Sequence, residues 1–260
     1  IGKADATSGN QLTNPAAIVR DLMTTIAGRD APNVAWVGYE AARLGIQCAG
    51  ELAAAVSLQS AIGALCGSIG ALYSSRGRQF ARVYPGGRYE GGGADPADES
   101  GPLVNVTLID TAECKASGIC NAVVIQFAYR GGSASRTIEV DAPDSIARFG
   151  RRVTTINAEW VGDARVAYDV AARLLTWRAE PSWWFKANNV PGDIRTLEVI
   201  HLSGTSKLPV PAHAVVLVAG YDPMRRSSAI EFESLTAHAG ALRFVRQSFA
   251  IEADQLAVAT

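Results

Sequence analysis

The sequence predicts an α+β fold in which a mixed domain of helices and hairpins, residues 1–180, is followed by a small antiparallel β-barrel, residues 181–260. Before Pro181, segments with the apolar spacing of helices alternate with segments that have the alternation of strands. After Pro181, only short strand-like segments remain, separated by Gly, Pro and Asp-Pro turns. A compact antiparallel unit has to close its own edges, and a barrel does so.

Helices are predicted only in the first domain. Asn14 is a good N-cap and Pro15 suits the first helical position, so a helix is expected near 14–27. Asp163 caps the clearest helical pattern of the chain, which ends near residue 178. The other helices are expected at about 36–44, 58–75 and 145–149.

The helix at 58–75 belongs to a charge-free stretch, residues 52–75, that includes Gly63 and Gly67. The stretch is long enough to cross a membrane. Its larger apolar residues, however, recur at the spacing of one helix face, with Ala, Ser and Gly on the others, which is typical of a helix packed in a bundle. We therefore expect this helix to be buried against its own domain or a neighbouring subunit.

Strand patterns account for most of the remaining chain. A hairpin is expected around Gly131 and Gly132, and Gly192-Asp193 and Asp222-Pro223 are expected in exposed turns. Residues 91–102, rich in turn formers and acids, are expected to form a surface loop. The expected strands are 79–84, 103–109, 122–129, 135–140 and 151–156 in the first domain, and 183–187, 194–202, 214–219, 229–235 and 242–249 in the second. Leu174 and Leu175 are expected where the two domains meet.

The charge balance argues against nucleic-acid binding. The chain has 24 Lys and Arg against 25 Asp and Glu, a formal net charge of −1, so no attraction toward a polyanion is expected. Charged residues make up 19% of the chain, below the roughly 25% usual for soluble domains. Part of the surface is therefore expected to contact other protein chains.

No residue is predicted to be catalytic, to bind a cofactor or to hold a metal. His201, His213 and His238 lack metal-ligand spacing and are interpreted as structural histidines, with a metal site formed only in the folded chain as the alternative. Cys114 and Cys120 are close enough in sequence for a disulfide, and two free thiols are the favoured interpretation. Sequence motifs of hydrolases, zinc proteases and phosphate loops are absent.

Two further groups of residues have a functional and a structural interpretation. Asp95, Asp98 and Glu99 could form an acid/base or calcium site, but a solvated acidic loop is the simpler account. Trp183, Trp184 and Phe185 could form a sugar platform. In a strand, Trp183 and Phe185 share one face and Trp184 takes the other, so a strand covered on both faces is favoured.

Several segments, taken in order, resemble the tail-tip proteins (host-specificity or baseplate hub proteins) of long-tailed phages and gene transfer agents. The resemblance is carried by the Asn-Pro-Ala opening with its apolar helix at 14–23, the region 41–48, the helix, glycine and strand unit at 61–80, the strand 121–127, the segment 138–152 with its Asp, Ser-Ile and Phe-Gly turn, and the Ala-rich helix 164–178. In that family these are followed by a barrel, which here would be residues 181 to about 250.

The resemblance implies a structural subunit of a phage-like tail tip (a baseplate hub) that closes the tail tube and supports host attachment and DNA delivery. It implies a homotrimer, located in the virion, with the tube-end (distal tail) protein, the tape-measure protein and tail fibres or receptor-binding proteins as partners. Contact with the host envelope would be indirect. Family members are longer, with a barrel before this segment and receptor-directed domains after it, so the chain is expected to be a central portion.

Two other classes of protein remain as alternatives. A tail-associated cell-wall hydrolase would need paired carboxylates or a metal set in a cleft. A carbohydrate-binding adhesin would need an exposed aromatic platform, which residues 183–185 would provide only if they face solvent.

Overall fold

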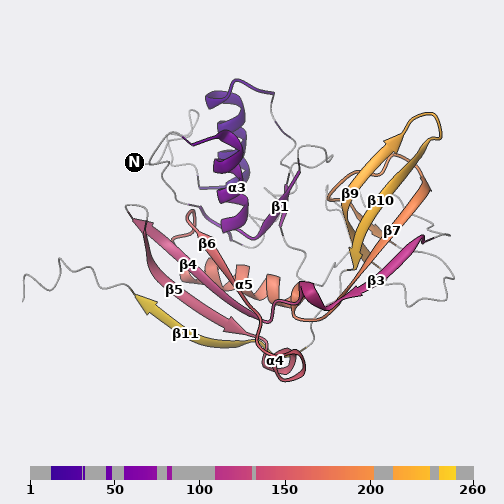
Figure 1. Ribbon diagram of the computed structural model, residues 1–260. Coiled ribbons are helices and arrows are strands. Elements are labelled where there is room, and N and C mark those ends of the chain that lie inside the picture. Colours follow the sequence, from indigo (N-terminus) through magenta and orange to yellow (C-terminus); the bar gives the residue numbers. More distant parts are fainter. Residues whose placement is uncertain are drawn as a thin grey trace, which may run out of the picture.

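Figure 1 shows the computed structural model of the chain, in which helices pack around a four-stranded sheet and a second, five-stranded sheet stands beside it. The structure describes residues 13–30, 32, 45–48, 56–74, 81–83, 109–130, 133–201, 213–234 and 240–249. Within these ranges the chain also forms a third, two-stranded sheet. The predicted α+β class is confirmed.

The chain enters the described fold through helix α1 (Pro15–Asp21), which continues as a π-helical turn, η1 (Leu22–Ile26). Asn14 Oδ1 accepts the backbone N–H of Ala16 at 2.8 Å and caps the helix, as predicted. The helix expected at 36–44 lies outside the described residues.

The charge-free stretch forms helix α3 (Leu58–Ser68), which is shorter than predicted. Gly70, with φ of +64°, turns the chain, and strand β1 (Ala71–Tyr73) pairs with β2 (Ala81–Val83). The prediction missed this turn because the helical spacing of apolar residues continues toward residue 75. A glycine in a left-handed conformation ends a helix even where that spacing continues.

Burial of α3 is confirmed, with Leu65 fully buried and Ile69, just after the helix, almost so. The contacts are specific as well as apolar. The Ser68 hydroxyl accepts the backbone N–H of Trp160 at 3.2 Å, and Arg173 donates to the carbonyl of Ile69 at 2.8 Å. Within the described part of the chain, no helix is both long enough and apolar enough to span a membrane.

The four-stranded sheet has the order β11-β5-β4-β6. Its strands are β4 (Ala122–Arg130), β5 (Ser133–Asp141), β6 (Val153–Ala158) and β11 (Arg243–Phe249), and helix α4 (Pro143–Phe149) connects β5 to β6. The β4-β5 hairpin is antiparallel, as predicted, whereas β6 runs parallel to β4. Helix α5 (Ala164–Arg178), capped by Asp163 as predicted, packs on this sheet (Figure 1).

The five-stranded sheet is antiparallel and has the order β3-β7-β10-β9-β8. Its strands are β3 (Thr111–Lys115), β7 (Ser182–Pro191), β8 (Val199–His201), β9 (His213–Asp222) and β10 (Ser227–Ser234). A separate core that includes Phe185, Ile200 and Phe232 lies against it. In the described residues this sheet is open, with β3 and β8 at its edges, so the predicted barrel is wrong.

The physical reason is an exchange of strands between the two sheets. Strand β3, a segment for which no strand was predicted, joins β7, and β11, expected in the barrel, pairs with β5 instead. Residues 183–249 therefore do not form one continuous unit. The division into domains 1–180 and 181–260 stays a prediction, and strand pairing crosses residue 180 twice.

The turns within the second region follow the prediction. Gly192 is exposed with φ of +101°, and Asp222 Oδ1 accepts the N–H of Met224 at 2.9 Å in a turn where Pro223 is exposed. The strand expected at 194–202 begins only at Val199, because Leu197 adopts a positive φ of 70° that a strand does not accommodate; residue 202 lies outside the described residues.

Candidate functional site

Two buried carboxylates on β5 lie at the centre of a network of ion pairs on one face of the four-stranded sheet. Glu139 is 7% exposed and Asp141 is 1% exposed, and they alternate with Ile138 and Val140, which lie in the hydrophobic core. Residues two apart in a strand share a face. Both acids therefore lie on the face of the sheet opposite to the core.

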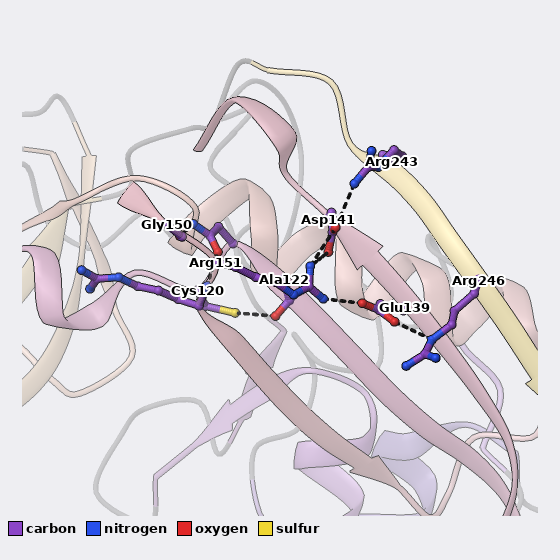
Figure 2. A network of polar contacts seen from close by, with 10 residues as sticks. Cys120, Ala122, Glu139, Asp141, Gly150, Arg151, Arg243 and Arg246 are labelled. Carbon is purple, nitrogen blue, oxygen red and sulfur yellow. Dashed lines mark hydrogen bonds and ion pairs between the residues drawn. The ribbon is translucent and has the colours of Figure 1, made fainter. Parts of the chain in front are cut away.

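Three arginines neutralise these carboxylates (Figure 2). Arg151 bridges the pair: one guanidinium nitrogen donates to both oxygens of Asp141, at 3.0 and 2.9 Å, and another donates to Glu139. From β11, Arg243 contacts Asp141 at 3.2 Å and Arg246 contacts Glu139 at 2.6 Å. Each carboxylate thus has two arginine partners, one from the loop after α4 and one from β11.

The three arginines differ in how much they contribute. The Arg151 side chain is 39% exposed, whereas those of Arg243 and Arg246 are 63% and 67% exposed. A solvated ion pair contributes about 0–1 kcal/mol, whereas a buried carboxylate left without a partner is costly. Arg151 is therefore the main counterion.

Asn121 holds the loop that carries Arg151. Its side-chain amide donates to the carbonyl of Gly150 at 2.7 Å and to the hydroxyl of Ser145 at 3.2 Å, and its Oδ1 accepts the N–H of Arg152 at 2.7 Å. Gly150 has φ of +72°, a conformation that favours glycine. The polar residues of segment 138–152 are thus used to place one arginine between two acids.

A second buried ion pair joins helix α5 to the five-stranded sheet. Arg178, the last residue of α5, donates to Glu233 on β10, and the Glu233 side chain is fully buried. Burial raises the pKa of the Glu233 carboxyl, and the charge of Arg178 opposes that increase. The Arg178 guanidinium also lies 4.0 Å from the centre of the Trp177 ring.

Trp177 forms the apolar part of this junction. It is 1% exposed and packs with Val215 of β9, in a small core to which Leu72 and Leu217 also belong. Leu174 and Leu175, which were expected at the junction, lie in the core of the first sheet instead. The register of α5 explains this, since Trp177 lies on the last turn, which extends past that core.

The aromatic residues 183–185 are covered on both faces of β7. Trp183 stacks on Phe185 at 6.3 Å between ring centroids, and Phe185 stacks on Phe232 at 5.1 Å. On the other face, the ammonium of Lys115 lies 4.4 Å from the centre of the Trp184 ring. Both tryptophans are half-buried, so this cluster is not an exposed platform.

The thiols and histidines form no reactive group where the structure describes them. Cys114 is exposed and Cys120 buried, and both are free. His201 and His213 lie opposite each other on β8 and β9, while His238 and the acids of residues 95–99 lie outside the described ranges. Among described residues no three His, Cys, Asp or Glu side chains gather as a metal site would require.

Sequence reasoning missed both ion-pair groups. Acids alternating with apolar residues at 138–141 were a signal for the first, because in a strand they imply buried carboxylates that need counterions. Nothing in the sequence linked Arg178 to Glu233, which are 55 residues apart.

The fold and its charged groups define an α+β protein in which the described buried ion pairs hold separate segments of the chain together. No protein-family model matches the chain, and no curated protein matches it. Among solved structures, the chain is similar to prophage tail protein gp18 from Listeria monocytogenes EGD-e, with 10% identity and a TM-score of 0.40, over 72% of this chain and 55% of that one.

A chain from the virion of a native gene transfer agent particle is also similar, with 15% identity and a TM-score of 0.42. That match covers 71% of this chain and 41% of the other. The chain therefore spans about half the length of the solved proteins to which it is similar.

Proposed function

We propose that this chain is a structural subunit of a phage-like tail tip, a baseplate hub that closes the tail tube and supports host attachment and DNA delivery. It acts as a homotrimer within the virion. Its partners are the tube-end protein, the tape-measure protein and the fibres or receptor-binding proteins. The observation that carries the proposal concerns the segments that resemble tail-tip proteins. Their polar residues hold these segments together around one sheet.

Those segments form one physical unit around the four-stranded sheet. Strand β4, the segment 138–152 and helix α5 pack together, and their polar residues hold them in place. The hydroxyl of Ser145 donates to the carbonyl of Ala179, and Arg152 donates to the carbonyl of Ala116. Polar residues used in this way fix the segments relative to one another, as we expect in a structural subunit.

The surface supports assembly with other chains. Large apolar side chains are exposed at several places: Met224 is 92% exposed in the β9-β10 turn, Val218 on β9 is 54% exposed and Phe244 on β11 is 48% exposed. A charge content of 19% leaves less polar surface than usual, and subunit interfaces are depleted of charge. These features fit a protein that is covered by neighbours in its working state.

We also propose that the chain is not an enzyme. The buried acids are paired with arginines, and a general acid or base has to be accessible to its substrate. Cleavage of peptidoglycan or polysaccharide by the purified chain, lost on changing a single carboxylate or histidine, would refute this proposal.

Two measurements test the structural role. Native mass spectrometry of the purified chain of 27.3 kDa should give a trimer of about 82 kDa, three times the chain mass. Antibodies against the chain should label one end of the tail in immunogold micrographs of tailed particles from the source cells. Antibody pre-absorbed with the chain is the control, and particles that stay unlabelled would refute the virion location.

A further inference from the structure

Strand β11 completes the four-stranded sheet without contributing a buried side chain over most of its length. Each of residues 243–248 is exposed, including Phe244 and Val245. An ordinary strand of a one-sided sheet buries every second residue. Strand β11 is therefore attached by its backbone pairing with β5 and by side-chain contacts, such as that between the rings of Phe244 and Tyr168, whose centroids are 6.3 Å apart.

The edge of β5 that receives β11 is formed by other parts of the chain. Ile138 and Val140 are anchored in the core, and Glu139 and Asp141 are held by Arg151. None of these groups belongs to β11. The edge would thus keep two placed carboxylates, together with its free backbone groups, if β11 left it.

These carboxylates select a particular segment. Arg243 pairs in register with Asp141 and Arg246 with Glu139, although the acids are two residues apart and the arginines three. A register shift between Phe244 and Arg246 absorbs the extra residue, as a β-bulge does. The matching ligand is an extended segment with two arginines three residues apart.

We propose that the β5 edge is a strand-acceptor site and that, in the assembled protein, residues 243–249 of a second copy fill it. An identical segment makes the same contacts from either chain, so exchange between copies sacrifices none of them. A neighbour would also cover Phe244 and Val245, which are 48% and 40% exposed in the single chain. This inference concerns assembly alone and holds for any oligomer of the chain.

The preceding strand limits where the neighbour can lie. Strand β10 ends at Ser234 in the other sheet, and the eight steps from there to Leu242 span at most about 29 Å at 3.6 Å per residue. The five-stranded sheet of one copy must then lie beside the four-stranded sheet of the next. Such a head-to-tail contact closes into a ring when the rotation between successive copies closes, and otherwise extends into a filament.

Cysteine pairs test the exchange in the full chain. Thr137 and Ser248 are register partners on β5 and β11, and Cys114→Ser removes the exposed native thiol. Burial raises the pKa of the Cys48 and Cys66 thiols to about 12 and also raises that of Cys120, so all three should stay unreactive. Two copies with different tags, one carrying Thr137→Cys and the other Ser248→Cys, are co-expressed and treated with a short bis-maleimide.

A covalent product that contains both tags is the expected result. It should disappear when Arg243→Glu and Arg246→Glu are added to the Ser248→Cys copy, and Thr155→Cys on the opposite edge strand, β6, should not replace Thr137→Cys. A control chain that carries both Thr137→Cys and Ser248→Cys tests whether β11 pairs with β5 at all. If that chain links only within itself and the mixed copies give no two-tag product, exchange between copies is refuted.

Discussion

Replacing Arg151 with alanine tests whether this residue is the main counterion of the two buried acids. Three of its hydrogen bonds go to Asp141 and Glu139, which are 1% and 7% exposed. A hydrogen bond to a charged group contributes about 1.5–3 kcal/mol, and removing one partner of a buried pair costs about 3–5 kcal/mol. Arg243 and Arg246 remain in contact with the acids, so we expect a smaller loss, about 2–4 kcal/mol.

The assay is urea unfolding of the wild type and of Arg151→Ala at neutral pH, with Arg243→Ala as the matched control. Arg243 contacts the same carboxylate, but its side chain is 63% exposed, so its removal should cost at most about 1 kcal/mol. Arg151→Lys keeps the charge without the two-pronged contact and should fall between the two. Equal losses for Arg151→Ala and Arg243→Ala would show that burial does not rank these ion pairs.

Three further predictions follow from buried groups. Leu65→Asp should prevent folding or assembly, since it places a carboxylate at a fully buried position, whereas Gln59→Asp, exposed in the first turn of the same helix, should leave the yield of soluble oligomer unchanged; a soluble, oligomeric Leu65→Asp protein contradicts the burial of α3. Because the folded state raises the pKa of Glu233 above its ordinary value of 4.5, folding favours the protonated form, and the free energy of unfolding should fall as pH rises from 4.5 through the folded pKa. Glu233→Gln should flatten that slope while Glu231→Gln, on the same strand but half-buried, should keep it, and an unchanged slope in Glu233→Gln would argue against the assignment. Trp177→Ala should cost about 3–5 kcal/mol in thermal or urea unfolding, compared with little for Met224→Ala at a 92% exposed site, and similar losses for the two would contradict the junction.

Local sequence signals predicted the elements whose causes lie within a few residues. Asn14 and Asp163 cap helices through their own side chains, and the β4-β5 hairpin forms between two strands that are adjacent in sequence. The aromatic strand at 183–185 alternates its faces as its period requires. Each of these features depends on backbone preferences and side chains in one short segment.

The choice of neighbours depended on the tertiary structure. Its apolar residues predict that 242–249 is a strand, but they do not show that this strand pairs with β5 rather than with β10, and Thr111–Lys115 has no strong strand pattern of its own. Strand pairing is decided by contacts between residues far apart in the chain, such as Arg246 with Glu139. The barrel prediction failed for that reason.

The sequence by itself determined the α+β class, most helix and strand positions, the burial of the charge-free helix and the exposed turns at Gly192 and Pro223. Only the tertiary structure decided that the four- and five-stranded sheets each take strands from both sides of residue 180, that Arg151 lies between two buried acids and that Trp177 packs at the junction. The physical reason is that period and capping act within a few residues, whereas the partner of a buried charge or of a strand edge is set by the packing of the whole chain.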